Sequence, residues 1–294
     1  MDLKRRLAEY KNRIESELAR QLSMESDFPP PIREAMTYSV LNGGKRLRPI
    51  LAIATGEMFA QNIEKLLPVC APLEFVQSFT LVHDDLPCMD DAAFRRGKPS
   101  LHITYGEANA VLVGDALLNL AYGAIAREGM KNFPSDRVLR VIVELSDALG
   151  TTGVMGGQVL DLDSASTKGS LQSLARLHQM KTASFFKASL RMGAILADAP
   201  PGDLEKLTRY SEEFGLAFQI SDDILDAIGT VEETGKDAGR DSFLEKTSYI
   251  SEYGVDGARK EAQKAVSRAK ASLEGLPGAD FLIALVDYLL ERRK

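Results

Sequence analysis

Apolar residues return at steps of three and four along most of this chain, and that spacing predicts helices. The first stripe would form one face of an amphipathic helix and comprises Leu3, Leu7, Tyr10, Ile14, Leu18 and Leu22. Comparable stripes cover 32–60, 68–86, 107–130, 135–160, 170–198, 203–229 and 257–292. No segment sustains the alternation typical of a strand. The sequence therefore predicts an all-α fold.

The breaks between the stripes are short and carry turn residues, as in "NFPSD" at 132–136 and "DAPPGD" at 198–203. The longest polar break, 229–246, mixes glycines with charges of both signs. It is predicted to be a functional loop or lid, because no break has the length and composition of a linker between domains. We expect one domain over 1–294.

Composition and charge exclude several classes of protein. The net charge of −6 argues against a nucleic-acid partner, because phosphate backbones select basic surfaces. Two cysteines, Cys70 and Cys88, are too few for a disulfide scaffold, which favours a reducing cytoplasm. The charged N-terminal segment does not resemble a secretory signal, and no continuous apolar run suggests a membrane span. A cytoplasmic protein without a membrane span is expected.

Two aspartate clusters interrupt apolar helical stretches. "LVHDDLPCMDDAAFRRGKPS" at 81–100 contains Asp84, Asp85, Asp90 and Asp91, and "FQISDDILDAIG" at 218–229 contains Asp222, Asp223 and Asp226. Like charges at i, i+4, as at Asp222 and Asp226, destabilise a helix unless a cation neutralises them. One such cluster is as often a solvated face, but two clusters favour a metal site. Carboxylate oxygens suit Mg²⁺, which completes its octahedron with water and phosphate oxygens.

Basic motifs supply the charge that a phosphate ligand needs. In "NGGKRLRP" at 42–49, Gly43 and Gly44 could let backbone N–H groups approach a phosphate, although such a turn is often only a helix start. Further cations in or near motifs are Lys45, Arg46, Arg48, Arg95, Arg96, Lys181, Lys236 and Lys246. Together the acidic and basic motifs predict Mg²⁺ bridging carboxylates to a diphosphate.

The order of these motifs closely resembles that of the trans-polyprenyl diphosphate synthases, along nearly the whole chain. The matching segments are "GGKRLRP", "DDLPCMD", "RRG", "GGQ" at 156–158, "KT" at 181–182, "FQISDDILD", "GK" at 235–236 and "KTSY" at 246–249. Four residues separate Asp85 from Asp90, as in bacterial farnesyl diphosphate synthases and several geranylgeranyl diphosphate synthases. The resemblance implies a helical bundle around a central cavity and a homodimer.

The resemblance also implies a role for each matching residue. The ligands of three Mg²⁺ ions would be Asp84, Asp85, Asp90 and Asp222, with Asp223 and Asp226 acting through water. The allylic diphosphate would be held by Arg95, Lys181 and Lys236, with Lys246 nearby, and isopentenyl diphosphate by Lys45, Arg48, Gln77 and Arg96. Thr182 and Gln219 would face the allylic cation, and Gln158 would line the cavity or pack between helices.

The implied enzyme is a trans-prenyltransferase that needs no Ser, Cys or His nucleophile. The allylic C–O bond ionises, isopentenyl diphosphate attacks the cation, and a proton is lost. His83 is then expected to be structural, and Cys88 a small filler. The nearest alternative is a geranylgeranyl diphosphate synthase. Less favoured are a class I terpene cyclase, which has less need of "GGKRLRP", and a non-catalytic synthase subunit, which would be expected to lose carboxylates present here.

Product length is predicted from the helix that carries the first acidic motif. Phe79 lies five residues before Asp84, about 7.5 Å along a helix, with Thr80 beside it. A bulky side chain there would stop the growing tail, although an ordinary core phenylalanine is the competing interpretation. An aromatic at this position resembles farnesyl (C15) more than geranylgeranyl (C20) synthases. Ala92 and Ala93 depart from the family pattern, which often has two acids there.

Overall fold

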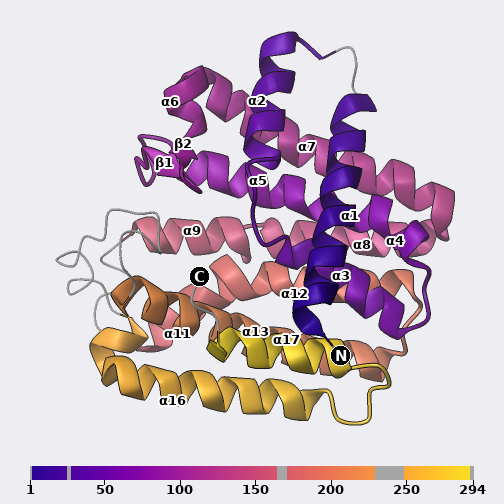
Figure 1. Ribbon diagram of the computed structural model, residues 1–294, viewed down its shortest axis with the longest axis vertical. Coiled ribbons are helices and arrows are strands. Elements are labelled where there is room, and N and C mark those ends of the chain that lie inside the picture. The colour runs from indigo at the N-terminus through magenta and orange to yellow at the C-terminus, as the bar shows by residue number, and fades with distance from the viewer. Residues whose placement is uncertain (1, 25–27, 164–170, 229–247, 292–294) are drawn as a thin grey trace.

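The structure is a computed structural model, and it describes residues 2–24, 28–163, 171–228 and 248–291. These residues form a bundle of helices (Figure 1), which confirms the all-α prediction. Besides α-helices, the described residues form one antiparallel hairpin and one π-helical turn. The hairpin consists of the two-residue strands β1 (Phe94–Arg95) and β2 (Lys98–Pro99), and the turn is η1 (Gln179–Ala183).

The α-helices follow one another with short connections. In chain order they are α1 (Leu3–Met24), α2 (Pro30–Val40), α3 (Leu47–Met58), α4 (Ile63–Cys70), α5 (Leu73–Asp84), α6 (Leu101–Tyr105), α7 (Glu107–Asn132), α8 (Ser135–Leu149), α9 (Val154–Leu162), α11 (Leu171–His178), α12 (Ser184–Leu196), α13 (Pro201–Ile228), α16 (Tyr249–Ser272) and α17 (Asp280–Glu291).

Several predicted helices are wrong as continuous elements because backbone breaks divide them. The stripe over 32–60 is divided into α2 and α3 by a loop in which Gly43, Gly44 and Arg46 have φ values of 79°, 125° and 56°. The stripe over 135–160 is divided into α8 and α9 between Leu149 and Val154. Side-chain periodicity continues across such breaks, so the apolar pattern alone does not reveal them.

The core is built around α12, which packs against α3, α8 and α13. This helix is apolar on nearly all sides, and its buried residues include Phe185, Phe186 and Leu190, as expected for a helix at the centre of a bundle. Beside it, α5 packs on α7 and α13 packs on α16. The end helices α1 and α17 meet, with the rings of Tyr10 and Phe281 edge-to-face at 5.4 Å.

No membrane span was expected. By length and composition alone, however, two stretches, Ile63–Asp84 and Glu107–Asn132, are long and apolar enough to cross a membrane. The first stretch is mostly buried in the bundle, with 72% of its most apolar window inside, which accounts for its hydropathy. The second stretch, α7, is only 44% buried over the same length of window. Exposed apolar side chains therefore remain on α7, among them Val111 and Leu112.

Candidate active site

The first acidic motif begins at the C-terminal end of α5 and folds back on itself. Asp84 is the last residue of the helix, and the Asp90 N–H donates a hydrogen bond of 2.9 Å to the Asp84 carbonyl oxygen. Burial raises the pKa of Asp84 to about 6; Asp90 and Asp85 add to the rise, whereas Lys181 and Arg95 oppose it. The carboxylate of Asp84 is thus placed where an additional cation would stabilise its charged form.

Asp85 is held by groups from the hairpin that follows the motif. It is only 3% exposed and accepts hydrogen bonds from the Arg95 guanidinium, with Nε at 3.0 Å from Oδ1, and from the Ser100 hydroxyl at 3.2 Å. Asp85 and Arg95 were predicted to bind a metal and a diphosphate, respectively. The structure brings them together as a two-point ion pair.

The "KT" motif lies on the π-helical turn η1, between α11 and α12. Lys181 Nζ donates to Asp161 Oδ2 on α9 at 2.6 Å. Thr182 Oγ1 donates to Gln219 Oε1 at 3.3 Å, and Gln219 Nε2 donates to Asp223 Oδ1 at 3.0 Å. This chain of hydrogen bonds links η1 to the second acidic motif on α13. Such π-helical turns occur often at functional sites.

The "GGQ" motif brings α9 against η1. A Cβ added to Gly157 would lie 2.4 Å from the Lys181 backbone nitrogen, so any larger residue would push η1 away. The next residue, Gln158, lines the main cavity. One motif therefore contributes both a close helix contact and a cavity wall. Asp161, one turn after Gly157, was not predicted as a site residue, although a carboxylate on the "GGQ" helix was the available signal.

The basic loop between α2 and α3 contains one structural arginine that the sequence did not distinguish from its neighbours. The Arg46 side chain is fully buried and forms an ion pair of 2.7 Å with Glu74 on α5. Its other guanidinium end donates to the Val40 carbonyl oxygen at 2.8 Å. Arg46 therefore holds the loop to α5 rather than facing a ligand. Glu74, its buried partner, was also not identified from the sequence.

Arg96 is seated on the two glycines of the same loop. It donates to the Gly43 carbonyl oxygen, and its Nη2 lies 3.8 Å from Glu74 Oε1. A Cβ on Gly44 would come within 2.7 Å of the Arg96 guanidinium, and the φ of 125° at Gly44 also disfavours any other residue. Gly44 thus makes room for a cation, a role that differs from the predicted approach of its N–H to phosphate.

Arg48 projects from α3 into the interior of the bundle. Its guanidinium stacks on Phe185 and Phe186, 4.7 Å from each ring centroid. Burial lowers the pKa of Arg48 to about 10; Glu74 and Asp222 oppose this, whereas Arg96 adds to it. The side chain therefore remains charged at neutral pH in an apolar surrounding, where it binds an anion more strongly than it would in water.

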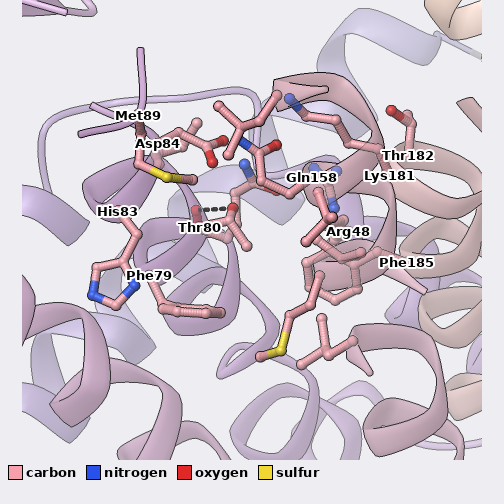
Figure 2. A pocket seen from close by; sticks show the side chains of 17 residues that line it. Arg48, Phe79, Thr80, His83, Asp84, Met89, Gln158, Lys181, Thr182 and Phe185 are labelled. Carbon is pink, nitrogen blue, oxygen red and sulfur yellow. Dashed lines mark hydrogen bonds between the residues drawn. The ribbon is translucent and has the colours of Figure 1, made fainter. Parts of the chain in front are cut away.

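These side chains meet at a cavity of about 470 Å³. Its walls include Arg48, Gln77, Phe79, Thr80, His83, Asp84, Met89, Gln158, Lys181, Thr182 and Phe185. Figure 2 shows Asp84 and Lys181 at the top of the cavity, with Phe79 lower down on the side of Asp84 and Phe185 on the other side. Three buried polar atoms in its walls, Arg48 Nε, Gln77 Oε1 and Gln158 Nε2, have no hydrogen-bond partner among the described residues. Because nearly all buried polar atoms in native proteins have a partner, this grouping favours a polar site.

Some predicted site residues cannot be placed at the cavity. Lys236 and Lys246 lie outside the described residues, as does the side chain of Asp226 within α13. Lys45 is exposed in the basic loop.

In the part of the chain that the structure describes, no three His, Cys, Asp or Glu side chains are grouped so that they alone could hold a metal ion. The described carboxylates fit Mg²⁺ in the way it is usually bound, through few carboxylates, water and substrate phosphate oxygens.

A comparison with protein-family models matches residues 29–275 to the polyprenyl synthetases. The chain belongs to the polyprenyl synthetase family. It is 41% identical to farnesyl diphosphate synthase of Escherichia coli, over 90% of each chain. It is also 39% identical to geranylgeranyl diphosphate synthase of Cyanophora paradoxa, over 97% of this chain and 95% of that protein.

Solved structures agree with this membership. The crystal structure of an FPP/GFPP synthase from Zymomonas mobilis, without ligand, is 34% identical to the chain and superposes with a TM-score of 0.87. The match covers 98% of this chain and 99% of that one. As a polyprenyl synthetase, the protein is an enzyme, a trans-prenyltransferase that condenses isopentenyl diphosphate with allylic diphosphates. Because synthases of C15 and C20 products match it equally well, family membership leaves its product length open.

Proposed function

We propose that the enzyme is a Mg²⁺-dependent farnesyl diphosphate synthase that elongates dimethylallyl and geranyl diphosphates to C15. The observation that carries this proposal is the position of Phe79. It lies on the same helix as Asp84, lines the same cavity, and is 8% exposed. An aromatic ring one helical turn below the diphosphate end leaves limited length for an isoprenoid tail.

The acidic motifs are proposed to hold Mg²⁺ through Asp84, Asp85, Asp90, Asp222, Asp223 and Asp226. The metal would neutralise the diphosphate as it leaves. Lys181, supported by Asp161, reaches the same end of the cavity as Asp84. Lys181, with Arg95, Lys236 and Lys246, would bind the leaving group more tightly as its charge builds, which accelerates ionisation.

The carbon skeleton is proposed to react in the middle of the cavity. The oxygens of Thr182 and Gln219, fixed by their mutual hydrogen bond, would face the allylic cation. Arg48, Gln77, Lys45 and Arg96 would hold isopentenyl diphosphate so that its double bond attacks that cation. The departing diphosphate would then accept the proton that is lost. Arg48 and Gln77 support this assignment, because each lines the cavity and has a buried polar atom without a hydrogen-bond partner among the described residues.

Product analysis tests the proposal directly. The purified chain is incubated with Mg²⁺, isopentenyl diphosphate, and each of the C5, C10 and C15 allylic diphosphates. We expect C15 from the C5 and C10 primers and little extension of the C15 primer. A C20 product from all three primers would assign the enzyme to the geranylgeranyl diphosphate synthases, which the 39% identity to the Cyanophora paradoxa enzyme makes the second candidate.

The size of the Phe79 side chain is the variable to change. We expect Phe79→Ala to lengthen the main product, because the ring that closes the cavity is removed. Phe133→Ala is a matched control, since Phe133 is equally buried at 8% and does not line the cavity. Unchanged C15 product from Phe79→Ala at normal turnover would remove Phe79 from this role.

A single catalytic domain, a homodimer and a cytoplasmic location complete the proposal. One large hydrophobic core includes residues from Tyr10 to Leu289, which supports a single domain. The apolar side chains exposed on α7 and α8 support self-association.

A further inference from the structure

The His83 ring has contacts on three sides that the proposed reaction does not use. It lies in the last turn of α5, beside Asp84, and packs edge-to-face against Phe79 with ring centroids 5.0 Å apart. Its Nε2 lies 3.0 Å from the Val111 carbonyl oxygen on α7. A carbonyl oxygen only accepts, so Nε2 carries the proton in this hydrogen bond.

Gly114 makes this position of the ring available. A Cβ built on Gly114 would lie 2.0 Å from His83 Nε2 and 2.3 Å from Cδ2. No side chain other than hydrogen fits there while the ring stays in place. The imidazole is therefore fixed between a seat on α7, formed by Val111 and Gly114, and the Phe79 ring on its own helix.

The cavity gives this arrangement a consequence for the substrate. His83 and Phe79 both line it, side by side and below Asp84 (Figure 2). Without the contact to His83, the Phe79 side chain could rotate about χ1 and so lengthen or shorten the cavity. The edge contact with an imidazole that α7 holds in place opposes this rotation, because the ring contact would be lost while the His83 ring stays hydrogen-bonded to Val111.

We propose that His83, seated over Gly114, is a positioning residue that holds Phe79 where it ends the cavity, so that the His83–Gly114 contact helps to set product length. The inference rests on the proposed function in one respect, the role of Phe79 as the end of the cavity. It assigns to His83 an effect on product length, distinct from metal or diphosphate binding.

The test compares product lengths of the wild type, His83→Ala, Gly114→Ala and the double variant, each with excess isopentenyl diphosphate and a C5 or C10 primer. We expect His83→Ala to raise the ratio of longer to normal product by up to about tenfold, which corresponds to losing one ring contact at the upper end of its ordinary strength. Gly114→Ala pushes the ring away from α7 towards the cavity, so shorter products should increase. In the double variant the added methyl group meets no ring, and its products should match those of His83→Ala.

A second comparison separates positioning from a general effect on the fold. In a Phe79→Ala background, His83→Ala should change product length little further, because His83 acts through Phe79. His102→Ala and Gly123→Ala are the matched controls. His102 is a buried histidine outside the cavity, and the three atoms nearest to a Cβ on Gly123, also on α7, all belong to the Arg127 side chain. Thermal unfolding of each variant identifies those that have merely lost stability.

Normal product lengths from folded, active His83→Ala would overturn the inference. Equal effects of His83→Ala with and without Phe79 would overturn it as well. Failure of the proposed function gives a different result, because it is seen in the wild type, which would then form a product other than C15 or no prenyl diphosphate at all. A wild type that makes C20 would refute the C15 assignment alone, since the variants are compared with the wild type's own product.

Discussion

Burial changes the proton affinity of His178, which lies directly before η1. Its ring stacks on Tyr249 at 6.1 Å, and burial lowers its pKa to about 4; Asp161 opposes this fall and Lys181 adds to it. Between pH 6.5 and 4 the unfolded chain therefore binds a proton that the folded protein excludes. Stability conferred by the neutral imidazole is complete above this window and is lost as the pH falls through it.

We expect His178→Phe, which keeps an aromatic ring against Tyr249, to make stability less dependent on pH. Between pH 7.5 and pH 5 the wild type should lose about 2 kcal/mol of unfolding free energy through this residue alone. Urea unfolding of both proteins at the two pH values measures the difference between their losses. Equal losses in the two proteins would show that His178 does not titrate in this way.

Asp84 and Asp91 form a matched pair for testing the first acidic motif. Asp84→Asn keeps the shape of the side chain but removes its charge, so turnover should fall by orders of magnitude if the carboxylate binds metal. Asp91→Asn should cost little, because Asp91 is exposed and its φ of 48° suits asparagine. Steady-state turnover with Mg²⁺ is the measurement, and near wild-type turnover in Asp84→Asn would contradict the proposed metal site.

Candidate site residues could be predicted from the sequence where several of them occur close together in one motif. The aspartate clusters and Lys181 were found in this way. Asp161, Glu74 and the structural role of Arg46 were missed because their contacts join segments far apart in the chain: Glu74 lies 28 residues from Arg46, and Asp161 lies 20 residues from Lys181. Only the folded chain shows which arginine of the basic loop forms a buried ion pair instead of facing a ligand.

At the scale of elements, apolar periodicity predicted the helices but not the points where they break. The breaks matter for the proposed site, because the basic loop lies between α2 and α3 and the "GGQ" helix begins after the break between α8 and α9. The π-helical turn was also not predicted. One additional residue in a helical turn leaves the apolar stripe almost unchanged, yet it displaces Lys181 and Thr182 relative to a regular helix.

The contact between α9 and η1 can be tested at Gly157. Gly157→Ala should displace η1, because its Cβ would meet the Lys181 backbone, and we expect lower kcat together with a lower Tm. Gly202→Ala is the control: a Cβ there meets nothing within 4 Å, so the substitution should be neutral or stabilise by about 0.4–1 kcal/mol. Steady-state kinetics and thermal unfolding distinguish these results, and full activity of Gly157→Ala would show that η1 tolerates displacement.

At the scale of the whole molecule, the homodimer prediction concerns the surface of α7 and α8. Leu112 and Leu139 are 56% and 62% exposed, which is unfavourable for apolar side chains that remain in water. We expect Leu112→Glu with Leu139→Glu to halve the molar mass measured by light scattering, because a dimer would bury these charges. Leu290→Glu on α17, at a leucine that is 41% exposed, should leave the mass unchanged. A monomeric wild type would contradict the prediction.

The ion pair between Asp85 and Arg95 gives the proposed site a thermodynamic property that neither residue has alone. Under the proposed roles, a metal that engages Asp85 releases Arg95, and a diphosphate that engages Arg95 releases Asp85. Each ligand thus lowers the cost of binding the other, and the coupling is equal in both directions by linkage. Metal and allylic substrate would bind cooperatively, with the broken ion pair as the shared cost.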